Sequence, residues 1–240
     1  MKNFVVISLQ GILICKNSNI VSISIIYSKP VDFSTFVTLN IVITKTINTI
    51  APEFKILQNM ITIDKMLHDR AADVEDAVKI FDGLEPVTLD FMIGRWKGYE
   101  IATGHAMDGL LEPTGWYGKY FKSPEEVHPL LFFANRKTEL YSVNPKLIPL
   151  GIQFPKTKLL GIVMAMLRPI LQTKKATARI RMIEYRNKVT GTMVYDEKAI
   201  LDHFVKINEN TMLGAMDLKG APSPYIFVLE RDTTEFKISI

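Results

Sequence analysis

The chain has 240 residues, of which 48% are hydrophobic and 22% are charged, and its formal net charge is +4. This length and composition are typical of a globular protein with one sizeable core, or with one core and an appendage. The basic excess is mild and forms no dense stripe, so we expect no nucleic-acid partner. The single cysteine, Cys15, excludes an intrachain disulfide and favours a cytoplasmic location.

Residues 1–57 differ in composition from the rest of the chain. They are rich in Ile, Ser, Asn and Thr and contain no Trp, Arg or His. Their composition is strand-like, but no apolar run approaches the roughly 18 residues of a membrane span. We therefore predict an extension that is separate from the main domain, and no stable membrane span.

The segment 62–85 has the pattern of a helix that docks on the main domain. Its apolar residues recur at spacings of four, three, four and three, which places them on one helical face. Gly83 suits a helix end, and Pro86 prevents the helix from continuing. The stripe consists of Leu67, Ala71, Val74, Val78 and Phe81.

From residue 86 to residue 240 the pattern changes to short strands separated by turn residues. Five closely spaced strands at the C-terminal end predict an antiparallel meander, and closure into a barrel would remove its exposed edges. The expected strands are 94–101, 114–121, 129–133, 139–143, 177–186, 189–196, 199–207, 211–218 and 224–231. The fold class is therefore mainly β, an antiparallel barrel with a preceding α-helix. About nine strands can enclose one small ligand.

A proline-rich stretch interrupts this rhythm and predicts a short helical insertion near 157–172. Its apolar core runs from Leu159 to Leu167 and is too short to span a bilayer. Three interpretations stay open: a helix that closes one barrel end, a lid over an apolar ligand, or a segment that touches a membrane.

Several motifs occur in a fixed order and together resemble a known family. The chain resembles the GXWXG family with its companion C-terminal domain of unknown function, over roughly 63–232. That family has no established activity, so the resemblance implies domain boundaries and no mechanism. The motifs are Met92–Gly98, Thr103–Leu111, Gly115–Phe121, Met193–Asp196, Leu213–Gly220 and Phe227–Arg231.

The chain is also similar, more loosely, to lipocalin-like (calycin-like) and nitrobindin-like barrels. In lipocalins a Gly-x-Trp begins the first strand, and a late arginine packs over the tryptophan. The similarity implies structural roles for Trp96 and Arg231 at one barrel end, with Arg186 as the alternative partner. A guanidinium over an indole gains about 0.5–2 kcal/mol.

His203 is the most interesting single residue in the predicted strand 199–207. Strand alternation places Asp202 on the opposite face, so the adjacent Asp202 and His203 do not form a simple catalytic pair. If the face of His203 lines the lumen, its imidazole can bind a ligand or serve as the proximal ligand of haem. The alternative is a core histidine with its hydrogen bonds satisfied.

Four further residues complete the candidate ligand-binding set. His105 and Asp108 lie in a glycine-bounded loop that forms either a functional barrel mouth or a well-made turn. Lys119 and Tyr195 lie in predicted strands. The chain contains no G-x-S-x-G, zinc-protease or phosphate-loop pattern, so the catalytic residues, if any, stay unknown and we assign no metal.

These features favour a barrel that binds a small, largely apolar molecule. The alternatives are an enzyme that uses His105, Asp108 or His203 as acid and base groups, and a haem-binding barrel. The sequence identifies neither the ligand nor the oligomeric state.

Overall fold

The computed structural model describes residues 62–134, 138–149, 157 and 159–240. These residues belong to one compact unit, Asn59–Ile240. The predicted extension over 1–57 lies outside the described residues.

The segment before the barrel forms two helices. Residues 62–69 are helical, and α2 (Val74–Gly83) follows. Between them Arg70 has a φ of 50°, and its carbonyl accepts a hydrogen bond from the Ala102 amide. The apolar periodicity of 62–85 continues through Arg70, so the sequence pattern does not show that the helix is interrupted there.

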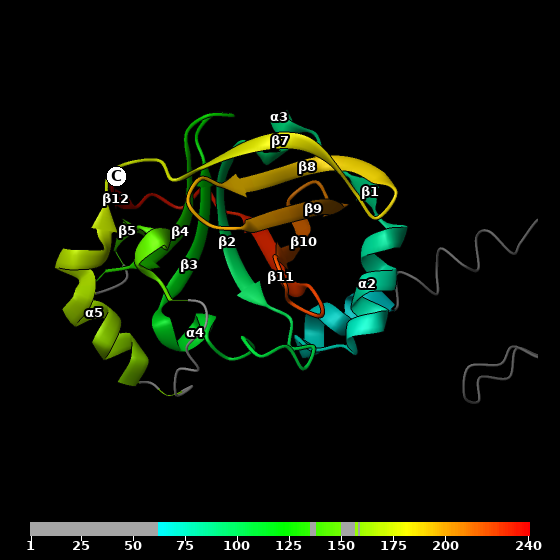
Figure 1. Cartoon of the computed structure of the whole chain (residues 1–240), viewed down its shortest axis with the longest axis horizontal. Helices are drawn as coiled ribbons and strands as arrows, with labels where there is room; N and C mark the ends of the chain where they lie inside the picture. The colour runs from blue at the N-terminus through cyan, green and yellow to red at the C-terminus, as the bar shows by residue number, and fades with distance from the viewer. Residues whose placement is uncertain (1–61, 135–137, 150–156, 158) are drawn as a thin grey trace, which may run out of the picture. The chain divides into compact units, whose positions relative to one another are not determined.

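Eight antiparallel strands close into a ring, as Figure 1 shows. The ring order is β2, β3, β4, β7, β8, β9, β10, β11, and the pair Val127–Ala178 between β4 and β7 closes it. This confirms the predicted calycin-like, mainly β fold. The strands are β2 (Gly94–Glu100), β3 (Trp116–Phe121), β4 (Val127–Phe133), β7 (Ala178–Tyr185), β8 (Lys188–Tyr195), β9 (Ile200–Asn208), β10 (Thr211–Leu218) and β11 (Tyr225–Arg231).

One predicted strand lies beside the ring. The first residue of β4 pairs with β7, whereas Leu131 to Phe133 pair with β5 (Glu139–Val143). The two ends of β4 thus have different neighbours, and β5 extends the sheet outside the barrel. β5 also pairs with β6 (Gln172–Thr173) and, in parallel, with β12 (Lys237–Ser239), while β1 (Glu85–Pro86) pairs with β9.

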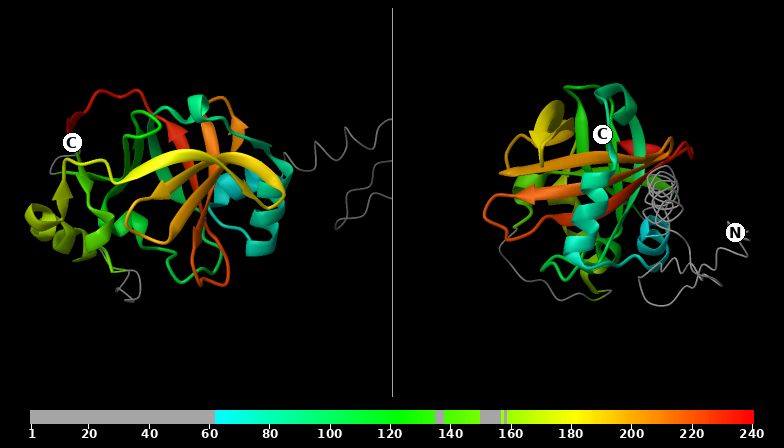
Figure 2. Two further views of the ribbon diagram at one scale, coloured as in Figure 1. Left: turned by 45° about the horizontal axis from the view of Figure 1, so that its top comes forward. Right: turned by 90° about the vertical axis from the view of Figure 1, so that its right-hand side faces the viewer.

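Short helices lie on opposite sides of the barrel (Figures 1 and 2). On one side α4 (Leu111–Thr114) packs against α5 (Leu159–Leu171), and α5 confirms the predicted helical insertion. On the other side α2 covers the outer face of β9, β10 and β11, where Phe81 packs with Val205 and Ala215. α3 (Leu89–Met92) directly precedes β2. Within the described residues, no helix is long and apolar enough to cross a membrane.

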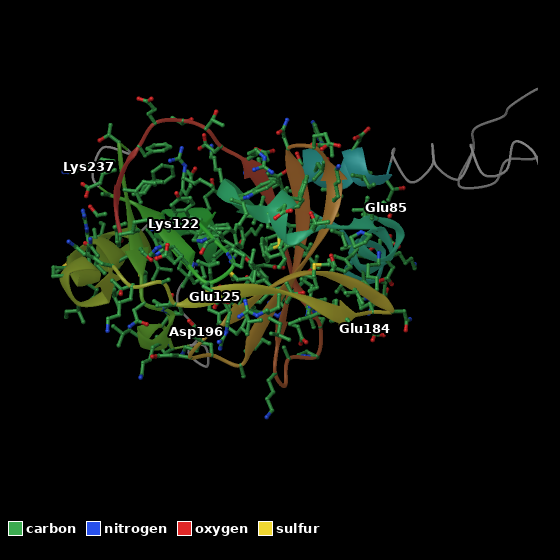
Figure 3. The ribbon with its side chains drawn as sticks, turned by 90° about the horizontal axis from the view of Figure 1, so that it is seen from above. Glu85, Lys122, Glu125, Glu184, Asp196 and Lys237 are labelled. Atoms are coloured by element: carbon green, nitrogen blue, oxygen red, sulfur yellow. The ribbon has the colours of Figure 1, made fainter. Side chains whose placement is uncertain are left out.

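The most basic strand carries its charge in ion pairs. Arg179 of β7 lies 3.2 Å from Asp196, and Arg181 lies 2.6 Å from Glu125. Figure 3 shows Asp196 and Glu125 near the beginning of β7, with Glu184 at its far end. The two arginines therefore contribute little net positive charge to this face.

Candidate functional site

One end of the barrel is closed by the first strand and the last. The Trp96 indole donates a 2.7 Å hydrogen bond to the Met92 carbonyl, and the Arg231 guanidinium lies 4.2 Å above its ring. Arg231 also donates to the carbonyls of Ile93 and Phe91. Arg186, the alternative partner, instead pairs with Asp82 on the outside of the barrel.

A buried ion pair crosses the lumen above this closed end. Lys119 comes from β3 and Asp202 from β9, strands on opposite walls of the ring. Their Nζ and Oδ2 atoms are 2.8 Å apart, and the side chains are 3% and 1% exposed. Phe121 and Phe204 pack below them with ring centroids 5.8 Å apart. The ion pair therefore separates the packed, closed end of the barrel from the upper part of the lumen and forms the floor of that upper part.

Tyr195 of β8 joins this pair. Lys119 Nζ donates to the Tyr195 hydroxyl at 3.4 Å and to the Pro129 carbonyl at 3.3 Å. Burial raises the pKa of Asp202, while Lys119 and the Tyr195 hydroxyl oppose the rise. Burial and the neighbouring Asp202 charge also raise the pKa of Tyr195, so its phenol stays protonated at neutral pH.

A cavity of about 960 Å³ lies above the ion pair. Its volume is within the range of small-molecule sites, and its wall is mainly apolar and aromatic. Three groups of residues form most of the cavity wall: the loop 104–107 together with α4, the inner face of α5, and the barrel strands. The apolar and aromatic lining includes Trp116, Phe132, Ile148, Leu160, Met164, Leu171, Met216, Tyr225 and Phe227.

The loop at the cavity mouth is held by the Asp108 carboxylate. Asp108 Oδ2 accepts hydrogen bonds from the amides of Thr103 and Gly104 at 2.9 and 2.8 Å, which makes a local turn. His105 lines the cavity and lies 5.3 Å from the Tyr225 ring, centroid to centroid. Of this predicted pair, His105 faces the cavity, while Asp108 shapes the loop that presents it.

His203 lies on the outer face of the wall, away from the cavity. Its ring stacks on Tyr185 at 3.8 Å, and Nδ1 is 2.9 Å from Thr192 Oγ1. The side chain is fully buried, and burial lowers its pKa to about 4. His203, the proximal ligand that the haem hypothesis names, therefore does not face the lumen. Among the described residues, no three His, Cys, Asp or Glu side chains converge as a metal site.

The structure thus brings His105, Lys119 and Tyr195 to one cavity and adds Asp202, which sequence reasoning left out. Strand alternation correctly separates Asp202 from His203 but does not tell which face points inward. A carboxylate between Ile200 and Phe204 on one strand face was the available clue, because a charge on an apolar face needs a buried partner.

The fold and the cavity define the class of the protein: a closed β-barrel with a ligand-sized cavity over a buried ion pair. Residues 79–137 match the GXWXG protein family, and residues 176–231 match a domain of unknown function (DUF4334). A crystal structure of a protein from Thermomonospora curvata is 30% identical over 73% of this chain and 99% of its own, with a TM-score of 0.55. No curated protein matches. The chain belongs to the GXWXG family with its DUF4334 companion domain.

Proposed function

We propose that the barrel binds a small, largely apolar molecule in the cavity above Lys119 and Asp202. The observation that supports this proposal is a mainly apolar cavity of about 960 Å³ whose floor is a buried ion pair. Such sites combine apolar walls with a few polar groups that orient the ligand. A cytoplasmic location remains a prediction from the single cysteine.

The same geometry weighs against the enzyme alternative. Of its three acid and base candidates, only His105 lines the cavity, while Asp108 is engaged in a turn and His203 lies outside. General acid–base work needs such groups within reach of one substrate. The enzyme alternative thus keeps His105 alone of its three candidates, in a cavity that also contains Lys119, Tyr195 and Asp202.

The test uses the full chain and the neutral fluorescent probe N-phenyl-1-naphthylamine. We expect saturable binding to the wild type, weakened about tenfold in Leu160→Trp because the larger ring occupies the cavity. Ile162→Trp is the matched control, since Ile162 lies on the outward face of α5 and is 58% exposed.

Fluorescence titration gives the dissociation constants, and native mass spectrometry of the purified protein reports any retained molecule. Absence of saturable probe binding, or equal weakening by both tryptophan variants, would count against the proposal.

A further inference from the structure

Two buried polar atoms of cavity-lining residues have no hydrogen-bond partner within the described part of the chain. They are Asp202 Oδ1, an acceptor, and Trp116 Nε1, a donor. Buried polar groups in folded proteins are nearly always paired, so each unpaired one needs an explanation. In a cavity, an ordered water or a polar group of the bound molecule supplies such a partner.

Lys119 has no N–H left for such a partner. An ammonium group carries three donors, and Lys119 faces three acceptors: Asp202 Oδ2, the Pro129 carbonyl and the Tyr195 hydroxyl. The rings of Trp116, Tyr195 and Phe227 also surround its Nζ at 5.1 to 5.8 Å from their centroids. The cation therefore neutralises Asp202 and is not free to receive an anionic ligand.

We propose that the cavity takes an apolar molecule bearing a hydroxyl group, which donates to Asp202 Oδ1 and accepts from Trp116 Nε1. This inference rests on the proposed function and specifies its ligand class. A hydroxyl is both a donor and an acceptor, so it offers each of the two atoms the kind of partner that the atom lacks.

Other polar groups match the two unpaired atoms less well than a hydroxyl does. A carboxylate only accepts, and it would face the Asp202 carboxylate, whose cation Lys119 is fully engaged, while Lys198, the other cation of the lining, donates to the Ile148 carbonyl. An ether accepts but leaves Asp202 Oδ1 unpaired. A protonated amine donates but leaves Trp116 Nε1 unpaired and lies close to Lys119. Sites built to bond a hydroxyl reject analogues that lack it, because their own buried groups stay unpaired.

The experiment displaces the same naphthylamine probe with four ligands of equal chain length: 1-decanol, 1-methoxydecane, decanoate and decylamine. For the wild type we expect 1-decanol to bind about tenfold more tightly than each of the others. Equal binding of the alcohol and the ether, or preference for decanoate or decylamine, overturns the inference. The proposed function survives that result if the probe itself binds saturably, and both fail if it does not.

A paired variant separates the polar floor from the apolar walls. Lys119→Met combined with Asp202→Leu removes both charges together, and such replacements commonly keep or raise stability. We expect this variant to bind the probe but to lose the preference for 1-decanol over 1-methoxydecane. Retention of the full preference contradicts the inference.

Thr192→Val is the matched control, because Thr192 is buried and polar but lies beside His203 on the outer face. Thr192→Val should keep the wild-type preference for 1-decanol over 1-methoxydecane. Loss of this preference in Thr192→Val would contradict the assignment of the hydroxyl contact to Asp202. If the paired variant does not fold, the four-ligand series on the wild type still decides.

Discussion

Lys119 and Asp202 join opposite walls of the barrel inside its core. Burying an ion pair costs desolvation that its attraction only partly offsets, and apolar substitutes are often at least as stable. Losing one partner alone leaves an uncompensated charge and typically costs about 3–5 kcal/mol. Stability alone therefore does not explain why an ion pair occupies this position, whereas a role in binding does.

His203 makes the stability of the protein depend on pH. Its folded pKa is about 4, below the ordinary value near 6.5 of an unfolded histidine. Between these values the unfolded chain binds the extra proton, so the free energy of unfolding falls as the pH falls from about 6.5 towards 4. The largest loss attributable to His203 is roughly 3 kcal/mol.

We expect His203→Phe, which preserves stacking on Tyr185, to show a smaller loss of stability between pH 7 and about pH 4.5 than the wild type. Urea unfolding at both pH values measures the difference. The exposed His68→Gln variant should behave like the wild type. A loss as large in His203→Phe as in the wild type would assign the pH dependence elsewhere, for example to the buried His128.

The residue-level site was only partly predictable from the sequence. Lys119, Tyr195 and His105 stood out by residue type, and they meet at one cavity. His203 stood out for the same reason but faces outward. The difference depends on which face of β9 points into the ring, and both faces carry apolar residues because α2 covers the outer one.

At the scale of elements, α5 has an unusual distribution of apolar side chains. Leu160, Met164 and Leu171 line the cavity, yet Ile162, Met166 and Ile170 are 58%, 74% and 68% exposed. Only the inner face contributes to the site, so substitutions on the two faces separate cavity effects from helix effects.

The contact of α5 with α4 depends on Gly161. A Cβ there would lie 2.7 Å from the Pro113 carbonyl oxygen, too close without a shift of one helix. We expect Gly161→Ala to displace α5, weaken binding of N-phenyl-1-naphthylamine several-fold, and lower the melting temperature by a few degrees. Ala165→Ser, at an exposed position of the same helix, should change neither. Fluorescence titration and thermal unfolding provide the measurements, and unchanged binding in Gly161→Ala would show that this contact does not shape the cavity.

The elements themselves were largely predictable from the sequence. Strands bounded by turn residues were located to within two residues, because alternation and turn chemistry are local properties. The break at Arg70 was not predicted, since it depends on backbone hydrogen bonds with Ala102, which is distant in sequence. The position of β5 outside the ring also depends on long-range pairing along β4.

For the whole molecule, the pairing of β4 with β7 closes the ring within residues 94–231. The protein from Thermomonospora curvata matches over 99% of its own length while leaving about a quarter of this chain without a counterpart. We therefore expect residues 59–240 to fold alone, with the melting temperature and probe affinity of the full chain. Circular dichroism and fluorescence titration test this, and a truncated chain that is unfolded or does not bind the probe would contradict it.

The sequence by itself determined the family, the mainly β class, the helical insertion and most strand positions, because these follow from local periodicity and ordered motifs. The tertiary structure alone decided that Lys119 meets Asp202 across the lumen, that His203 faces outward, and that α5 walls a cavity. These outcomes depend on ring closure, which brings together strands distant in sequence and fixes the inner face of each.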